Sequence, residues 1–525
     1  MAIPFVVLNL GARVNTGLKG FAQLVPNNWD DFSYKTLFSL HYVNSSGIHI
    51  EFGSVKIGYQ GQSKGWSKDN IPSRFDVLPE GWFSVGQDVD YYVQARQSLT
   101  SKEREEILGG IRDVVVNERA LAIAKKEDVF TTSLLRGVSE LTINGQYRRV
   151  LRGEAVLTDF NFSYQDPGGE KRSPVDLSFH VVAGSRPPTN VHVLIGRNGI
   201  GKTTILNGMV KAVHPEYGDG RTGEFVSNEH FFIQPGLPDE YFSGVVSVSF
   251  SVFDPFVPPP DNVEPTKGAK YFYIGMKKDR LGTVAQSNGS LKSEPDLIED
   301  FVRGFAMCMS QEAKRTRWLK AIDRLSSDGN FAAMNLPLLA EFSLQRPGDA
   351  SDAARRLLGL MSSGHKIVLL TITALVNLVE EKTLVLMDEP ESHLHPPLLS
   401  AFTRSLSELL HDRNGVAIVA THSPVVVQEV PRSCVWKLNR SGLEWRKDRP
   451  ERETFAENVG LLTNDVFGLE VSKSGFHALL QEEVDKGKTF DQVAKSFGHK
   501  IGVEGMAILM SMIASRDRMA SGASN

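Results

Sequence analysis

One nine-residue segment constrains this chain more than any other. Residues 196–204 read Gly-Arg-Asn-Gly-Ile-Gly-Lys-Thr-Thr and follow a short apolar run at 191–195. Glycines let successive N–H groups point at phosphate oxygens, and the start of the helix that follows adds partial positive charge. Strand, glycine-rich loop and helix in this order predict an α/β fold, with a mostly parallel sheet beside a phosphate site.

The phosphate loop supplies the first candidate binding residues. We expect Lys202 to reach the β- and γ-phosphates of a nucleotide and the Thr203 hydroxyl to bind Mg²⁺. A chance glycine turn before a helix is the alternative, but strand, spacing and the Lys-Thr pair all agree with a nucleotide site. The expected nucleotide-binding residues are Gly196, Arg197, Asn198, Gly199, Ile200, Gly201, Lys202, Thr203 and Thr204.

A second segment carries two adjacent carboxylates. Residues 383–390 read Thr-Leu-Val-Leu-Met-Asp-Glu-Pro, and the apolar run predicts a buried parallel strand. The carboxylates would emerge at its carboxyl end, beside the phosphate loop. We expect Asp388 to hold Mg²⁺ through water and Glu389 to polarise an attacking water. Plain surface charge is the alternative for an isolated acidic pair.

Small residues at 362–364 open an apolar helix that we expect at 367–379. Ser362, Ser363 and Gly364 would expose N–H groups able to bind an anion, although an ordinary helix cap has the same composition.

His422 follows another apolar run, at 417–420, and could contact a terminal phosphate. A lone histidine is more often structural, but its place at the end of a strand favours the functional interpretation.

The order of these four motifs resembles the ABC ATPase superfamily over residues 155–440. The resemblance implies a head with a mostly parallel sheet, an antiparallel β subdomain and a helical signature subdomain. It implies ATP and Mg²⁺ as ligands, and a homodimer or higher even oligomer in which Ser362, Ser363 and Gly364 bind the ATP of a second protomer. Glu389 and His422 would then be the catalytic residues, and Thr203 and Asp388 the metal ligands.

Details favour one branch of that superfamily. Leu394-His395-Pro396, together with 421–424, is similar to OLD, RecF and SMC-type ATPases, and His395 stands where transporters usually have Asp. Tyr164 resembles the aromatic residue that stacks on adenine, with packing inside a strand as the alternative. The glutamine that completes magnesium coordination stays open between Gln234 and the region of Asp254.

The resemblance divides the chain into three. Residues 1–150 form a mixed α+β region without a catalytic constellation, in which Thr100 and Glu103 predict a helix that runs to about Val116. Residues 151–440 form the ATPase domain, with 255–350 as an insertion and helical subdomain. Residues 441–525 are mostly helical.

The C-terminal part suggests a partner. Residues 453–468 resemble Septu-type (PtuA-like) defence ATPases, which act with an HNH-type nuclease, and no Asp-x-Asp of a Toprim nuclease follows the ATPase. The sequence therefore predicts an ATPase subunit of an anti-phage defence system that regulates a nuclease. A DNA repair or chromosome-maintenance ATPase, binding DNA or RNA, and a transporter subunit are the alternatives.

Composition and the length of the apolar segments indicate the compartment in which the protein works. A net charge of −4 gives no bulk basic character, and two cysteines exclude a disulfide framework. The apolar run at 367–379 is shorter than the roughly 20 residues that a bilayer requires. We therefore expect a cytoplasmic protein that binds no membrane.

Overall fold

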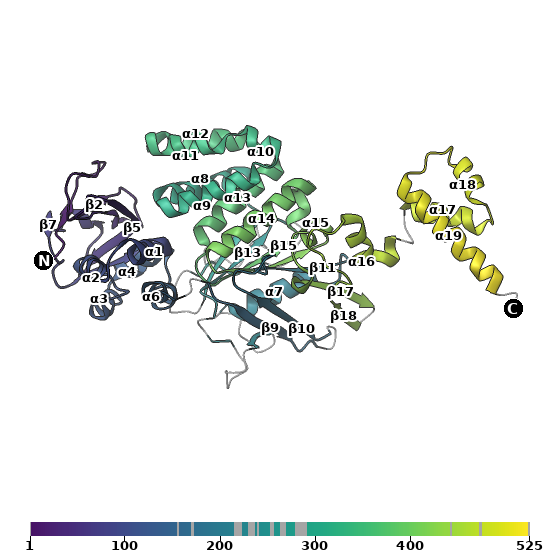
Figure 1. The fold of residues 1–525 in the computed structure, drawn as a ribbon, viewed down its shortest axis with the longest axis horizontal. Coiled ribbons are helices and arrows are strands. Elements are labelled where there is room, and N and C mark those ends of the chain that lie inside the picture. Colours follow the sequence, from purple (N-terminus) through teal and green to yellow (C-terminus); the bar gives the residue numbers. More distant parts are fainter. Residues whose placement is uncertain are drawn as a thin grey trace.

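The computed structural model divides into an N-terminal α+β region, a central α/β domain and a C-terminal group of helices (Figure 1). It describes residues 2–154, 157–169, 173–214, 223–228, 237–238, 241–251, 257–262, 269–278, 291–441, 444–471 and 475–522. Within these ranges no helix combines the length and the apolar character that crossing a bilayer requires.

The N-terminal region is built on a six-stranded sheet in the order β7-β1-β2-β4-β5-β8. Apolar side chains from this sheet and its helices form one buried cluster that includes Phe5, Phe83 and Tyr147. The strands are β1 (Phe5–Val7), β2 (Phe21–Pro26), β4 (Leu37–Val43), β5 (His49–Tyr59), β7 (Arg74–Phe75) and β8 (Trp82–Gly86), with a separate pair β3 (Tyr34–Lys35) and β6 (Gly65–Trp66). The helices are α1 (Val89–Ser98), α2 (Ser101–Gly110), α3 (Glu118–Ala124), α4 (Asp128–Thr132), α5 (Glu140–Thr142) and α6 (Arg148–Arg152).

Helix α2 confirms the predicted capping box but corrects the predicted length. Thr100 and Glu103 bond each other's backbone N–H groups, as expected. The helix ends at Gly110 and not near Val116, because Gly109 and Gly110 weaken it and Arg112 takes a left-handed φ of 51°.

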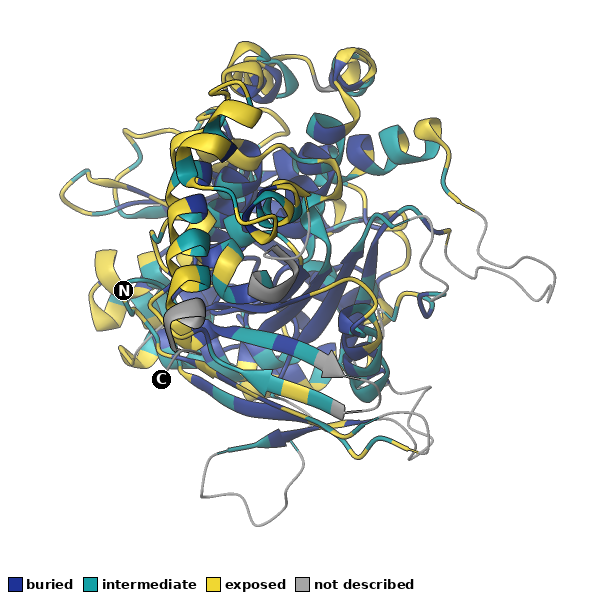
Figure 2. Ribbon diagram, turned by 90° about the vertical axis from the view of Figure 1, so that its right-hand side faces the viewer, coloured by how far each residue is buried: buried dark blue, intermediate teal, exposed yellow. Residues whose placement is uncertain are grey.

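The central domain contains a seven-stranded sheet in the order β14-β13-β15-β16-β11-β17-β18, parallel except for the last pair. Successive residues of each inner strand face opposite layers, and both layers are apolar: Leu384 and Leu386 enter one core, Val385 and Met387 the other. Figure 2 shows these strands buried through the middle of the molecule. The strands are β11 (Val191–Gly196), β13 (Gly244–Ser249), β14 (Lys270–Gly275), β15 (Thr383–Asp388), β16 (Val416–Thr421), β17 (Val435–Ser441) and β18 (Glu444–Asp448).

Helices and a small sheet cover the two faces (Figure 1). Helix α7 (Lys202–Val213) packs on one face together with the antiparallel strands β9 (Phe160–Asp166), β10 (Val175–Val181) and β12 (Glu224–Ser227). The other face carries α8 (Glu294–Ser310), α9 (Glu312–Leu325), α13 (Ser363–Leu378) and α14 (Pro396–Asp412). Helices α10 (Gly329–Ala333), α11 (Leu336–Gln345) and α12 (Pro347–Leu360) lie beyond α8 and α9.

Part of the segment expected as an insertion belongs to the main sheet. Residues 270–275 form strand β14, which pairs in parallel with β13. Tyr271 and Ile274 are buried there, at 2% and 4% exposure. This aromatic and β-branched run was hidden by the Pro, Gly and Lys residues around it, which had favoured a surface loop.

The C-terminal region is helical, as expected, after β18. Helix α15 (Pro424–Val427) belongs to the central domain and precedes β17, whereas α16 (Val459–Val471) follows β18 and sends Leu462 and Val466 into the core of that domain. Helices α17 (Gly475–Asp485), α18 (Phe490–Ser496) and α19 (Val503–Gly522) share a small core of their own and stand apart from the body in Figure 1.

A buried ion-pair cluster joins the N-terminal region to the central domain. Asp88, which caps α1, lies 2.6 Å from Arg317 of α9 and 3.1 Å from Arg413 after α14. Burial alone would raise the pKa of Asp88, but the two guanidinium groups hold it well below its ordinary value. The ion pairs therefore stabilise the folded protein fully above about pH 4, the pKa of an aspartate in the unfolded chain. This stabilisation is lost as the pH falls through the lower pKa that Asp88 has in the folded protein.

Replacing Asp88 with alanine should destabilise the protein by about 3–5 kcal/mol, because two buried arginines lose their counter-charge. Urea unfolding followed by tryptophan fluorescence at pH 7 measures the change. Asp352→Ala removes a carboxylate from an exposed ion pair with Arg355 and serves as the control. Equal unfolding midpoints for both variants would contradict the assigned role of Asp88.

Candidate functional site

Three neighbouring strands end at one edge of the main sheet. Strand β16 lies between β11 and β15 and runs parallel to both. Their carboxyl ends therefore bring together the phosphate loop (residues 196–204), the acidic pair and the histidine after β16. We call this place the carboxyl edge.

The phosphate loop turns sharply into α7. Gly201, at the N-cap of that helix, has a φ of 102°, a left-handed conformation that favours glycine. The Lys202 ammonium donates to the carbonyls of Gly196 and Arg197 at 2.9 and 3.0 Å. Burial lowers the pKa of Lys202, while the carboxylates of Asp388, Glu389 and Glu391 act in the opposite direction. In the rest of the loop, Ile200 is buried, and Arg197, Asn198, Gly199 and Thr204 are exposed.

The proposed metal ligands lie in contact with each other. The Thr203 hydroxyl donates to Asp388 Oδ2 at 2.8 Å, across 185 positions of sequence. Hydroxyl and carboxylate oxygens are the ligands that Mg²⁺ prefers, so the two residues fit this ion.

Glu389 and His422 face each other across the carboxyl edge. His422 Nδ1 lies 3.8 Å from Glu389 Oε1. Glu389 has a φ of 45°, a strained conformation for a residue other than glycine, and its N–H donates to Ala420 O at 2.9 Å. The side chains are 31% and 43% exposed, so both remain accessible from solvent.

Sequence reasoning missed Glu391, which holds the histidine of this pair in place. Its Oε1 accepts the Thr421 hydroxyl and the His422 N–H, both at 2.6 Å, and lies 3.0 Å from His422 Nδ1. Its side chain is 8% exposed. The available signal was a glutamate directly after Asp388-Glu389-Pro390. In the structure this residue lies in the short helix η6 (Pro390–His393).

Ser362, Ser363 and Gly364 open helix α13, as predicted. Ser362 caps the helix, and both serines are exposed. Gly364 is buried, and a Cβ there would lie 2.3 Å from the carbonyl oxygen of His393 in η6. Ser362 contacts His365 of the same helix, and Gly364 packs against η6, the short helix whose Glu391 holds His422.

Tyr164 does not stand where an adenine could stack on it. Its side chain is 1% exposed, and its ring packs against Phe225 with centroids 5.3 Å apart. The alternating pattern of β9 points this residue into the core between the small sheet and α7, so the packing alternative is correct. Gln234 and Asp254, the two candidates for the magnesium glutamine, lie outside the described residues.

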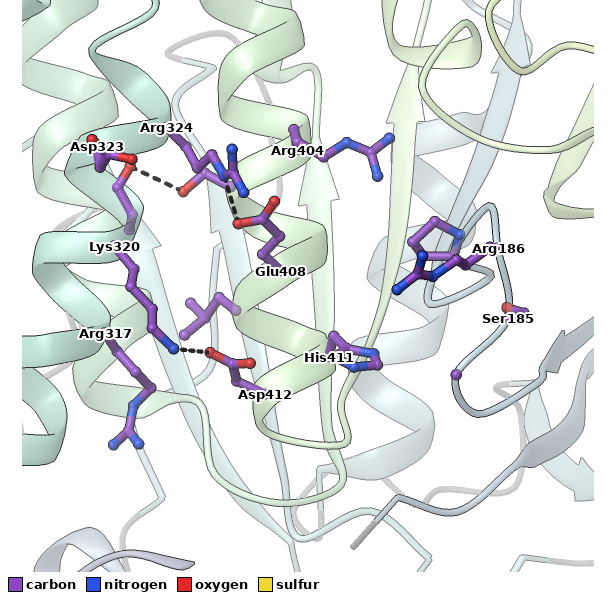
Figure 3. A pocket seen from close by; sticks show the side chains of 15 residues that line it. Ser185, Arg186, Arg317, Lys320, Asp323, Arg324, Arg404, Glu408, His411 and Asp412 are labelled. Atoms are coloured by element: carbon purple, nitrogen blue, oxygen red, sulfur yellow. Dashed lines mark hydrogen bonds and ion pairs between the residues drawn. The ribbon is translucent and has the colours of Figure 1, made fainter. Parts of the chain in front are cut away.

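A separate cavity of 650 Å³ lies toward the other end of α14 (Figure 3). That helix is about 25 Å long, so the cavity is remote from the carboxyl edge. Four of the basic side chains that line it are paired with carboxylates: Arg324 with Glu408 at 2.8 Å, Arg404 with Glu429 at 3.0 Å, Lys320 with Asp412 at 3.8 Å and Arg317 with Asp88 at 2.6 Å. Because these charges are already paired, the cavity is a weaker candidate for binding an anion than the phosphate loop.

Residues 329–428 match the family described as "AAA domain, putative AbiEii toxin, Type IV TA system". The match runs from α10 past α15 and includes Ser362, Asp388, Glu389 and His422. This part of the chain is thus similar to an AAA domain, and the phosphate loop lies N-terminal to the matched residues.

The whole chain also has a relative of nearly equal length. It is 45% identical over 531 residues to "Protein ea59" of Escherichia phage lambda, covering 98% of this chain and 99% of that protein. Among solved structures, an ATP-binding cassette of an ABC transporter in its ADP conformation aligns over 52% of this chain and 85% of its own (16% identity, TM-score 0.26). UvrA2 from Deinococcus radiodurans aligns over 58% and 40% (12% identity, TM-score 0.29).

Gly364→Ala should destabilise the protein by about 1–3 kcal/mol, because the new methyl group must displace the backbone of η6. Gly359→Ala is the matched control: it lies in α12, where a Cβ meets nothing within 4 Å, and should leave stability equal or slightly higher. Thermal unfolding of both variants measures the difference. Identical melting temperatures would show that the close contact does not require glycine.

Proposed function

The chain belongs to the family of protein ea59 of Escherichia phage lambda, and we propose that it is an ATP-hydrolysing switch. The observation that carries this proposal is the meeting of Lys202, Thr203, Asp388, Glu389 and His422 at the carboxyl edge. These residues provide a cation for phosphates, oxygen ligands for a metal, a base and a hydrogen-bonding imidazole.

Each residue has a distinct task in hydrolysis. Lys202 neutralises charge on the β- and γ-phosphates as the bond to the leaving group breaks. Thr203 and Asp388 would hold Mg²⁺, which supplies further positive charge to the phosphates. Glu389 orients water for in-line attack and accepts its proton. His422 is held at its Nδ1 by Glu391, and it would bond the γ-phosphate through Nε2 as an imidazolium, since a neutral ring with its hydrogen on Nδ1 has no donor at Nε2.

We infer that the working unit is a head-to-head dimer. Ser362 and Ser363 are exposed at the N-terminus of a helix, where free N–H groups favour an anion. The Ser362 hydroxyl contacts His365 of its own helix, and this supports a role of the exposed serines toward the ATP of a second protomer. Since the γ-phosphate is the group that they would bind, ATP favours the closed dimer and ADP does not.

Glu389→Gln should retain ATP binding, lose turnover by at least about a hundred-fold, and accumulate the closed dimer, because the water loses its base. Phosphate release measures turnover, and light scattering on a sizing column measures how much dimer forms. Ser362→Ala should bind ATP as a monomer and fail to dimerise. Turnover retained in Glu389→Gln would refute the base assignment, and unchanged dimerisation in Ser362→Ala would refute the composite site.

We further propose that this switch is the ATPase subunit of a phage-related defence system and regulates a partner nuclease of the HNH type. Two findings support this role: the family that matches residues 329–428 carries the description "putative AbiEii toxin, Type IV TA system", and the full-length relative is a phage protein. The segment that resembles Septu-type ATPases, residues 453–468, presents Phe455 and Leu461, 40% and 44% exposed, as an apolar contact for such a partner.

A DNA repair or chromosome-maintenance role is the second candidate. It rests on the same ATPase residues and on the likeness of 394–396 and 421–424 to RecF and SMC-type proteins. This role requires that DNA or RNA stimulates ATP hydrolysis. It also requires that the affinity for the nucleic acid falls steeply as the salt concentration rises. A transporter subunit is the third candidate function. The large N-terminal region, which buried ion pairs join to the central domain, argues against it.

Affinity purification of the natively expressed chain with Mg-ATP should recover a nuclease. Phe455→Ser and Leu461→Ser should each reduce that recovery at least about ten-fold without changing ATP binding, because they remove apolar contact area. Val77→Ser, at an equally exposed apolar residue of the N-terminal region, is the control. Recovery of DNA without a nuclease would move the assignment to repair.

A further inference from the structure

Three polar side chains, His365, Asp328 and His395, lie behind Ser362, the exposed serine that caps α13. The Ser362 hydroxyl oxygen lies 2.6 Å from His365 Nδ1, and His365 Nε2 lies 3.3 Å from Asp328 Oδ1. The other oxygen of Asp328 lies 3.0 Å from His395 Nε2. A chain of contacts therefore runs from the protein surface at Ser362 through His365 to one carboxylate.

That carboxylate is a fixed acceptor. Asp328 has a 6% exposed side chain, and its Oδ1 also caps α10 by accepting the Phe331 N–H at 2.8 Å. Burial would raise the pKa of Asp328, but the bonds from Phe331 and His365 outweigh it and lower the pKa. Asp328 is therefore ionised at neutral pH and can only accept hydrogen bonds.

An acceptor at one nitrogen of an imidazole decides what the other nitrogen does. With Asp328 facing Nε2, a neutral His365 carries its hydrogen on Nε2 and leaves Nδ1 as an acceptor. The Ser362 hydroxyl must then donate to Nδ1. Its proton is then directed inward, one lone pair of its oxygen accepts the His365 backbone N–H as the helix cap, and the side toward solvent offers no hydrogen.

This orientation is wrong for binding a phosphate. A γ-phosphate presents only acceptor oxygens, so Ser362 must offer it a donor. A proton added at Nδ1 reverses the bond: the imidazolium donates to the serine oxygen, and the hydroxyl hydrogen is free to point outward. The imidazolium also adds positive charge, which Asp328 balances from behind.

We propose that Ser362 receives the γ-phosphate of a second protomer only when His365 takes up a proton, and that His365 and Asp328 are positioning residues for this contact. The proposal rests on the composite site proposed above. Proton uptake and dimer closure are then one coupled event at each site.

Few side chains other than His365 could provide positive charge beside Ser362. His365 packs beside the Phe331 ring, 5.7 Å between centroids, and the neighbouring Lys366 is paired with Glu294 of α8. His395, half-exposed before α14, faces the same carboxylate. Within the described residues, no three His, Cys, Asp or Glu side chains are arranged to hold a metal ion, so the two histidines are not a metal site there.

Calorimetry in buffers of different ionisation heats measures the coupled proton. ATP and Mg²⁺ are titrated into the full-length Glu389→Gln protein at pH 8, where an imidazole is ordinarily neutral. The heat should vary with the buffer and correspond to about one proton taken up per site. Adding His365→Asn keeps a polar atom near the Nδ1 position but cannot titrate; it should abolish this uptake and weaken ATP-driven dimerisation about ten-fold, the factor that one hydrogen bond represents.

Two further variants separate this role from a purely structural one. Asp328→Asn retains a helix cap but no longer stabilises an imidazolium, so the uptake should fall well below one proton per site. His411→Asn, at the far end of α14, should keep the full uptake. ATP-driven dimerisation with no buffer dependence, or uptake unchanged in His365→Asn, would overturn the coupling while leaving the composite site intact. A protein that binds ATP without dimerising would instead refute the proposed switch.

Discussion

The parallel pairing of β11, β16 and β15 is the constraint on which the rest of this structure depends. Parallel strands end on the same side, so three segments separated by as many as 225 positions deliver their loops to one place: Gly196 ends β11, Asp388 ends β15 and Thr421 ends β16. The sheet can hold this register because both of its faces are buried. A one-residue slip of any inner strand would exchange two apolar cores and move the carboxylates away from the phosphate loop.

The central parts of this arrangement were predictable from sequence because each leaves a local signature. The phosphate loop needs glycines at fixed spacing, and a strand buried on both faces must be a run of apolar residues such as 383–387. Strand β14 was not predicted because its six residues lie among residues typical of loops. Helix α2 was predicted to be too long because the apolar periodicity continues at Ile111 and Val115, after the helix has ended.

Contacts between distant segments were beyond sequence reasoning. Glu391 is one acidic residue among many until the fold places it under Thr421 and His422. Tyr164 shows the opposite error, since the motif around it resembled a nucleotide contact while its position in β9 directs it into the core. Asp328 belongs to no motif at all, yet it faces two histidines that come from opposite sides of the acidic strand in sequence.

Helix α14 gives these separate contacts a mechanical connection. It begins beside His395, whose imidazole faces Asp328, and it ends at Arg413, whose guanidinium is buried against Asp88 of the N-terminal region. A helix of 17 residues behaves as a rigid rod over this distance. Its apolar face is packed from Leu398 to Leu410 against the main sheet and α9, which prevents one end from moving alone. The contact beside the serine cap and the ion pairs that hold the N-terminal region are therefore made at the two ends of the same helix.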